Sequence, residues 1–173
     1  MSAATAPALA GWSSGEAGRV VVALGLALAG LWAVELHPAA RGMLAPLELV
    51  TAQLTAAMLG WIGLPVAREA TVLVHAEGFA CEIYHTCTAF TPVVFLVAAI
   101  AAWPAPRRAR ILGVLVGAVL LVLLNQARLV SLVWAGVHVP HVFGVAHTMA
   151  WPALLILATA GYWLAWAKAV HRR

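Results

Sequence analysis

The sequence predicts an all-α polytopic membrane protein, with about five transmembrane helices and a small extracytoplasmic, hairpin-like segment. Of its 173 residues, 64% are apolar and only 9% are charged, whereas a soluble domain carries about 25% charged residues. Several apolar stretches also approach the roughly 20 residues that a helix needs to cross about 30 Å of hydrocarbon. These observations exclude an ordinary water-soluble domain and a disordered chain. They also exclude a nucleic-acid binder, since the net charge of +4 reflects scarce acids and not a dense basic surface.

The predicted spans follow from the positions of the apolar stretches. The second stretch is the most polar, because it contains Glu48 and three uncharged polar residues. No linker or repeat interrupts the chain, so residues 1–173 are expected to form a single membrane domain. The five expected spans are residues 20–36, 46–65, 84–103, 111–136 and 147–167.

Basic residues predict the orientation, because they favour the cytoplasmic side of a membrane. The strongest basic cluster lies in residues 104–110, which form a predicted cytoplasmic loop, and the second lies in residues 168–173. Arg41 falls on the same side if the first two spans are antiparallel, and Glu35 is expected near it. The chain should therefore begin outside and end in the cytoplasm, with the extracytoplasmic segment 66–86 outside.

Short-range patterns predict local structure in three places. Residues 71–75 and 78–83 look like two strands of a hairpin in the extracytoplasmic segment. Gly113 and Gly117 form a GxxxG step that should let another helix approach closely. Pro92 and Pro152 each come five residues after a reactive side chain, and each is expected to lie inside a helix and bend it near its outer end.

Arg128 is the polar residue least explained by topology. It lies about 25 Å along a helix from the cytoplasmic Arg110, and Asn125 is three residues earlier on the same helix face. An arginine in the middle of a membrane helix costs about 2.5–3.5 kcal/mol on insertion scales. The pair favours an inward-facing polar site, although an arginine that extends to the interface is the alternative.

Two other reactive side chains are expected at the same depth as Arg128. Cys87 lies at the outer start of the third span, and His147 lies at the outer start of the fifth. Topology alone therefore brings a thiol, an imidazole and a guanidinium to one face of the membrane. For Cys87, a small packed residue is the plain structural alternative.

These three groups suit acyl transfer from a peptide bond through a thioester. A thiol attacks as the thiolate, which a nearby cation or the first turn of a helix favours. A histidine takes up and returns protons near neutral pH. An arginine holds a substrate carbonyl or stabilises a tetrahedral oxyanion. We therefore expect Cys87 in the first turn of its helix, with Arg128 supplying the positive charge.

The stretch Cys81-Glu-Ile-Tyr-His-Thr-Cys87-Thr-Ala-Phe, followed by Asn125-Gln-Ala-Arg128 and then His147, resembles the exosortase/archaeosortase family over about residues 66–164. Members are polytopic membrane cysteine transpeptidases that cut C-terminal sorting signals of exported proteins. Each signal comprises a short motif, a membrane span and a basic tail. The resemblance implies that Cys87 is the nucleophile, Arg128 the oxyanion or substrate-positioning group, and His147 the acid/base, with Asn125 in support.

The resemblance is closest to the short exosortase H subgroup, whose presumed substrates carry an Ile-Pro-Thr-Leu type signal. The family usually has Ser-Gly after the nucleophile, whereas Thr88 and Ala89 follow Cys87 here, so a role for a glycine at position 89 is in doubt. Thr88 and His85 are further candidate substrate-binding or supporting residues. The resemblance implies a bacterial cytoplasmic (inner) membrane protein whose site faces the periplasm, with an unknown acceptor nucleophile and no cofactor or metal.

The sequence is also compatible with two other functions. Cys81 and Cys87 could exchange a disulfide with a quinone in a membrane thiol oxidoreductase, although they do not form a Cys-x-x-Cys motif. Alternatively, His138, His141 and His147 could ligate a metal or a haem, although irregularly spaced histidines without carboxylates are weak signs of zinc.

Overall fold

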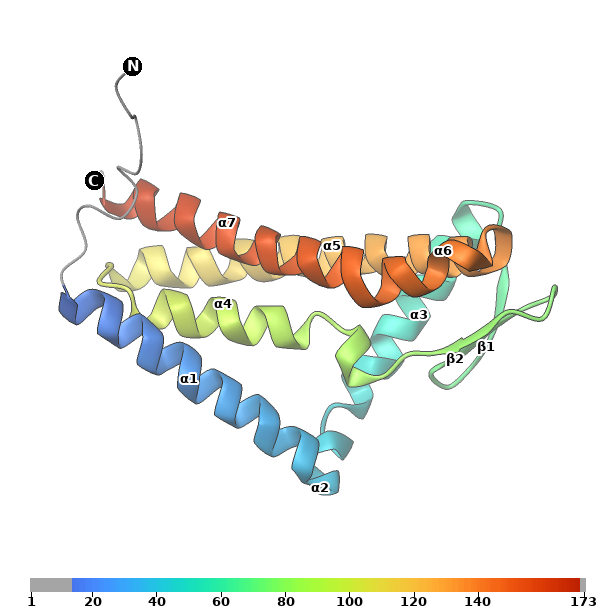
Figure 1. Cartoon of the computed structure of the whole chain (residues 1–173), viewed down its shortest axis with the longest axis horizontal. Helices are drawn as coiled ribbons and strands as arrows, with labels where there is room; N and C mark the ends of the chain where they lie inside the picture. Colours follow the sequence, from blue (N-terminus) through green and yellow to red (C-terminus); the bar gives the residue numbers. More distant parts are fainter. Residues whose placement is uncertain (1–13, 172–173) are drawn as a thin grey trace, which may run out of the picture.

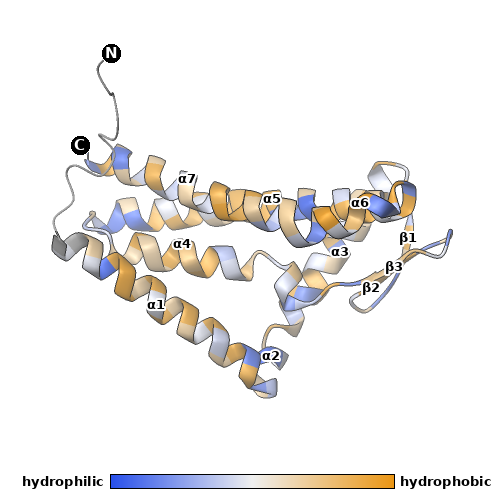
Figure 2. Cartoon of the chain, in the orientation of Figure 1, coloured by the Kyte–Doolittle hydropathy of each residue, from blue (hydrophilic) through white to orange (hydrophobic). Residues whose placement is uncertain are grey.

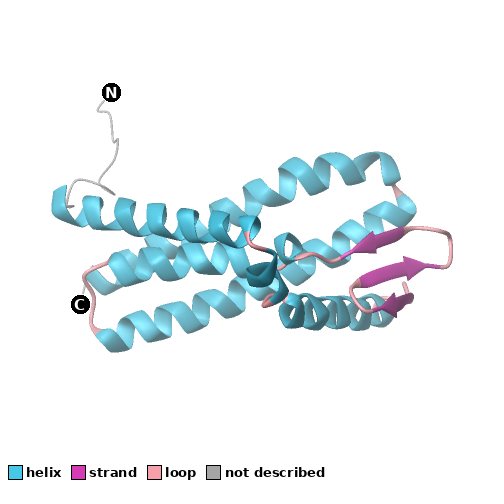
Figure 3. Ribbon diagram, turned by 90° about the horizontal axis from the view of Figure 1, so that it is seen from below, coloured by secondary structure: helices cyan, strands magenta, loops and turns pink. Residues whose placement is uncertain are grey.

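The structure, a computed structural model, describes residues 14–171 and consists of membrane-length helices with one small sheet at one end (Figure 1, Figure 3). Its elements follow in chain order. They are α1 (Ser14–Leu36), α2 (Pro38–Gly42), α3 (Ala45–Trp61), β1 (Val66–Glu69), β2 (Val72–His75), β3 (Ala80–Glu82), the 3₁₀ turn η1 (His85–Cys87), α4 (Phe90–Ala102), α5 (Arg107–His138), α6 (Pro140–Val145), the π-helical turn η2 (Ala146–Ala150) and α7 (Trp151–His171).

Four helical stretches in the described residues are long and apolar enough to cross a membrane. They are Ala17–Leu36, Pro38–Trp61, Arg107–His138 and Pro140–His171. The helix α4 is apolar but has 13 residues, which span only about 20 Å at 1.5 Å per residue. The chain is thus a mainly helical, multi-pass membrane protein, and the count of five spans stays a prediction.

Apolar residues make up much of each long helix (Figure 2). On α5, Leu115 and Leu123 are 58% and 60% exposed, and on α7, Leu154 and Leu157 are 45% and 69% exposed. A soluble monomer rarely exposes so continuous an apolar surface. These faces are therefore suited to contact with lipid chains.

The first helix runs in the direction opposite to the one that the sequence predicted. Val20, near the start of α1, packs in one buried cluster with Trp103 and Ala167. The start of α1 therefore lies at the end of the bundle where α4 and α7 end and α5 begins (Figure 1). The sequence predicted that the first span starts on the outer side, and this prediction is wrong for α1. The end of the bundle where α1 starts also holds Arg19, the loop 104–110 and Lys168, and we call it the basic end.

The reason for this reversal is the path of the chain after α1. The short helix α2 leads into α3, which packs against α5 and β1 and does not return beside α1. Arg41 in α2 and Glu35 at the end of α1 consequently lie away from the basic end, contrary to the prediction for both residues.

The buried contacts of α3 join it to the second half of α5 and to the sheet. Within the core, Thr55 is fully buried, and its Oγ1 lies 2.8 Å from Oε1 of Gln126 and 2.8 Å from the carbonyl oxygen of Thr51. The cluster around this pair is apolar and contains Ala52, Leu59, Leu64, Leu73, Ile83, Leu129 and Val133.

Three antiparallel strands in the order β1-β2-β3 occupy the predicted hairpin segment. The pairing of Leu73 with Cys81 sets the β2–β3 register, at the residues where two strands were expected. Gly78 has a φ of 91°, so the turn between them needs a residue that adopts the left-handed region without strain. The strand β1 was not expected, and the extracytoplasmic location of the sheet stays a prediction.

The predicted close approach at Gly113 and Gly117 is confirmed. A Cβ atom at Gly113 would overlap the ring of Trp166, and one at Gly117 would overlap Leu96 and Tyr162. The Tyr162 hydroxyl donates a hydrogen bond to the Gly113 carbonyl oxygen at 2.7 Å. Both glycines therefore let α4 and α7 pack directly on the backbone of α5.

The predictions for the two prolines have different outcomes: the one for Pro92 is wrong, whereas Pro152 lies inside a helix as expected. Pro92 is the third residue of α4, because this helix begins at Phe90, and an N–H in the first turn has no intrahelical acceptor. The prediction that Pro92 bends the interior of a helix is therefore wrong, because it lies in the first turn of α4. Pro152 lies inside the continuous rod Pro140–His171, directly after η2, as expected of a proline that interrupts regular α-helical bonding.

We predict that Gly117→Ala lowers the midpoint of thermal unfolding in detergent, because overpacking a tight contact costs about 1–3 kcal/mol. Gly161→Ala is the matched control, since a Cβ there has no neighbour within 4 Å. At that position alanine should be neutral or stabilising, because it favours the helix by about 1 kcal/mol over glycine. Equal shifts for the two variants would contradict the packing described.

Candidate active site

Cys87 lies in the single 3₁₀ turn η1 between β3 and α4. Its N–H donates to the Tyr84 carbonyl oxygen at 2.8 Å. The Thr88 hydroxyl, 2% exposed as a residue, donates to the His85 carbonyl oxygen at 2.6 Å, and the Phe90 N–H approaches the same hydroxyl at 3.3 Å. Cys87 is therefore held just before α4, and the prediction that it lies in the first turn of that helix is wrong.

Asn125 fixes the backbone of Cys87 to the middle of the bundle. Its Nδ2 donates to the Cys87 carbonyl oxygen at 2.8 Å, and the residue is 1% exposed. Because a carbonyl only accepts, the amide must present its NH₂ group in this orientation. Its Oδ1 is buried and has no hydrogen-bond partner among the described residues.

Arg128 follows Asn125 on the same face of α5 and is only 7% exposed. Its Nε is buried without a hydrogen-bond partner in the described part of the chain. The guanidinium interacts electrostatically with both Cys87 and His147. Arg128 therefore does not extend to solvent, and its charge acts on both the thiol and the imidazole.

His147 lies in η2, the π-helical turn that connects α6 with α7. Its ring stacks on Phe143, with centroids 5.6 Å apart and planes inclined by 6°. Among residues 14–171, no hydrogen bond joins the Cys87 thiol to His147. Single π turns are rare and occur frequently at functional sites.

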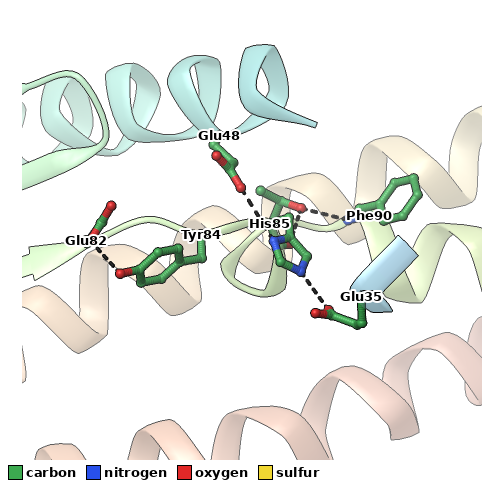
Figure 4. A network of polar contacts seen from close by, with 7 residues as sticks. Glu35, Glu48, Glu82, Tyr84, His85 and Phe90 are labelled. Carbon is green, nitrogen blue, oxygen red and sulfur yellow. Dashed lines mark hydrogen bonds and ion pairs between the residues drawn. The ribbon is translucent and has the colours of Figure 1, made fainter. Parts of the chain in front are cut away.

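His85 makes contacts that the sequence did not reveal. Its Nε2 lies 2.6 Å from Oε1 of Glu35, and its Nδ1 lies 3.5 Å from Oε1 of Glu48 (Figure 4). The side chain of His85 is 14% exposed. Because a carboxylate only accepts, the hydrogen bond to Glu35 requires the proton on Nε2 of His85. The contact joins the end of α1 and the first turn of α3 to the turn that holds Cys87.

The two carboxylates had no distinguishing signal in the sequence. Glu35 was expected near the cytoplasmic side, and Glu48 only marked a polar span. Both glutamates lie in apolar helical stretches with no motif around them. Their spacing in the sequence therefore did not predict the long-range contact with η1.

Cys81, the rival thiol, lies on β3 and packs with Cys87 against the α3–α5 core. Both cysteines are free and half-buried. Burial and, to a lesser extent, the neighbouring Cys87 raise the pKa of Cys81 to about 11. The thiol of Cys81 therefore stays protonated near neutral pH, which disfavours it as a nucleophile.

The predicted histidine cluster is not assembled into a ligand set. The ring of His138 stacks on Trp134, and its Nδ1 lies 3.0 Å from the Trp134 carbonyl oxygen. Within residues 14–171, no three His, Cys, Asp or Glu side chains are arranged to hold a metal ion.

A cavity of about 600 Å³ extends from the site along the bundle. Thr86, Thr88 and Arg128 line it at the site, and α1, α4 and α7 contribute the rest of its lining. That remainder is mostly apolar and includes Leu24, Pro92, Phe95, Leu96, Ala99, Pro152, Leu155, Ile156, Ala160 and Trp163.

An apolar helical bundle with a thiol, a guanidinium and an imidazole near one another defines a multi-pass membrane protein with a candidate site for a cysteine enzyme. Residues 1–164 match the family described as transmembrane exosortase, and the chain belongs to this family. No curated protein and no solved structure matches the chain.

We predict that Cys81 is alkylated slowly at pH 7 in a Cys87→Ala variant. A thiol with a raised pKa stays protonated, so the rate should rise about tenfold per pH unit and keep rising beyond pH 9. Iodoacetamide labelling followed by mass spectrometry measures this profile. A plateau near pH 9, the behaviour of an unperturbed thiol, would show that burial does not suppress the thiolate.

We also predict energetic coupling between His85 and Glu35. In a double-mutant cycle of His85→Ala and Glu35→Gln, thermal unfolding in detergent should give a coupling energy of about 0.5–3 kcal/mol. His141→Ala, which removes an exposed histidine, is the control and should not couple with Glu35→Gln. Additive effects of the His85 and Glu35 substitutions would rule out a stabilising contact.

Proposed function

We propose that the protein is a membrane-embedded cysteine protease or transpeptidase that cleaves C-terminal sorting signals of exported proteins. The observation that carries this proposal is the position of buried Arg128 within electrostatic range of both Cys87 and His147. Membership of the transmembrane exosortase family supports the same activity, because that family is known for cysteine-type transpeptidases.

In the proposed reaction, Cys87 Sγ attacks the carbonyl carbon of the scissile peptide after His147 accepts the thiol proton. The tetrahedral oxyanion is stabilised by Arg128. Collapse of this intermediate breaks the C–N bond, forms the thioester, and returns the proton from His147 to the leaving amine. An acceptor amine, hydroxyl or water then attacks the thioester and releases Cys87.

Asn125, Thr88 and His85 act as supporting residues in this proposal. Asn125 holds the Cys87 carbonyl, and the Thr88 hydroxyl closes the turn around the nucleophile. His85 ties the same turn to α1 and α3 through its two carboxylates. All three hold Cys87 in position before the substrate arrives, which lowers the entropic cost of attack.

The proposed location is the bacterial cytoplasmic membrane. Arg19, Lys168 and the basic loop 104–110 gather at one end of the bundle, away from the site. By the positive-inside rule that end is cytoplasmic. The site would then face the periplasm, and the basic tail of a substrate would stay in the cytoplasm.

Co-expression with an exported reporter tests this function. The reporter ends in an Ile-Pro-Thr-Leu type motif, an apolar span, a basic tail and a C-terminal epitope. We expect Cys87→Ala to leave the reporter uncut, because no other group supplies the nucleophile. Cys81→Ala should process it normally, and immunoblotting of the epitope measures cleavage.

Arg128→Ala should lower kcat by about 10²–10³-fold, the usual effect of removing one oxyanion-stabilising donor. Arg128→Lys should recover part of the rate, since it restores the charge without the planar donors. Complete processing by Cys87→Ala would refute the proposal. Dependence on both cysteines would instead favour a thiol oxidoreductase, for which the shared core contact of Cys81 and Cys87 is the favourable observation.

A further inference from the structure

The cavity that starts at the site has two chemically different parts. At one end, Thr86 and Thr88 flank the turn of Cys87, and Arg128 contributes the only charge among the residues that line the cavity. From there it continues between α4 and α7, with Leu24 of α1 at its far part. Figure 1 shows α4 between α1 and α7 in this part of the bundle.

Arg128 is the charged donor at the polar end of the cavity. It is 93% buried (7% exposed), and its Nε has no partner in the described part of the chain. The Thr88 hydroxyl already donates to a backbone carbonyl, as does that of Thr159 within α7. An unsatisfied buried guanidinium is costly, so this end is suited to a ligand that brings an oxygen acceptor.

The rest of the cavity is suited to an apolar helix. Along α7 its lining extends from Pro152 to Trp163, which is about 16 Å or three helical turns. Ala99 and Ala160 lie among the lining residues, and small side chains let a membrane helix approach closely. A lipid chain would also fit an apolar wall, but the proposed reaction needs a peptide carbonyl at the Arg128 end, which a lipid chain does not bring.

We infer that this cavity is a docking groove for the apolar membrane helix of the sorting signal, which enters with its scissile peptide at the Arg128 end. The inference rests on the proposed function, because it names where that substrate binds. The helix that follows the scissile bond would run along α4 and α7 toward the basic end of the bundle.

A tryptophan substitution in α7 tests whether the groove binds the substrate helix. In Ala160→Trp the indole would fill much of the cavity, so the apparent KM for the reporter should rise about tenfold or more, with the larger effect on KM than on kcat. Ala165→Trp is the matched control, because Ala165 is exposed and does not line the cavity. Unchanged KM in Ala160→Trp, with both variants present at parental levels in the membrane, would overturn the inference.

Photo-crosslinking provides a second measurement that does not depend on turnover. In the full-length Cys87→Ala protein, a photoreactive residue replaces either Ile156, which lines the groove, or Leu120, which is 50% exposed on α5 and does not line it. We expect a covalent adduct with the reporter's apolar span at position 156 and none at position 120.

The outcomes separate the two proposals. If Cys87→Ala stops processing but position 156 captures only lipid, or no reporter, the groove inference fails and the proposed function stands. If Cys87→Ala still processes the reporter, the proposed function fails. A reporter adduct at position 156, together with the KM effect of Ala160→Trp, supports both.

Discussion

The candidate site depends on the hydrogen bond from Asn125 to the Cys87 carbonyl oxygen. The turn η1 is only three residues long and follows an exposed strand, so local bonding alone holds it weakly. The buried amide of Asn125 ties it to α5, the longest helix of the bundle. Because Arg128 is one turn further along the same helix face, this bond ties the Cys87 backbone to the helix face that carries the guanidinium.

The polar groups are placed where a membrane protein can tolerate them. Burying a charge in an apolar environment is costly unless it is paired or serves a function. Around η1, His85 pairs with carboxylates from α1 and α3, whereas Arg128 faces the cavity with its Nε unsatisfied. Toward the basic end, the contacts are mostly apolar, and Gly113 and Gly117 bring the helices together through their backbones.

The division of the cavity explains how one protein could act on a membrane-bound peptide. In the proposed mode of binding, the apolar wall along α4 and α7 would contact the membrane span of the substrate, and the guanidinium at its end would bind a peptide carbonyl. In a low-dielectric site such a donor stabilises developing negative charge more strongly than water does. In the proposed reaction Cys87 attacks the same carbonyl, so Arg128 would serve both substrate binding and catalysis.

Composition was sufficient to identify a multi-pass membrane protein, and spacing was sufficient to place Asn125 and Arg128 on one helix face. The common depth of Cys87, Arg128 and His147 stays a prediction, which rests on the alternation of the later apolar helices across the membrane. The direction of α1, the contacts of Glu35 and Glu48, and the apolar groove could not be predicted. Apolar stretches reveal that a helix enters the membrane but not which helix it packs against, and those choices depend on side-chain fit between segments far apart in the chain.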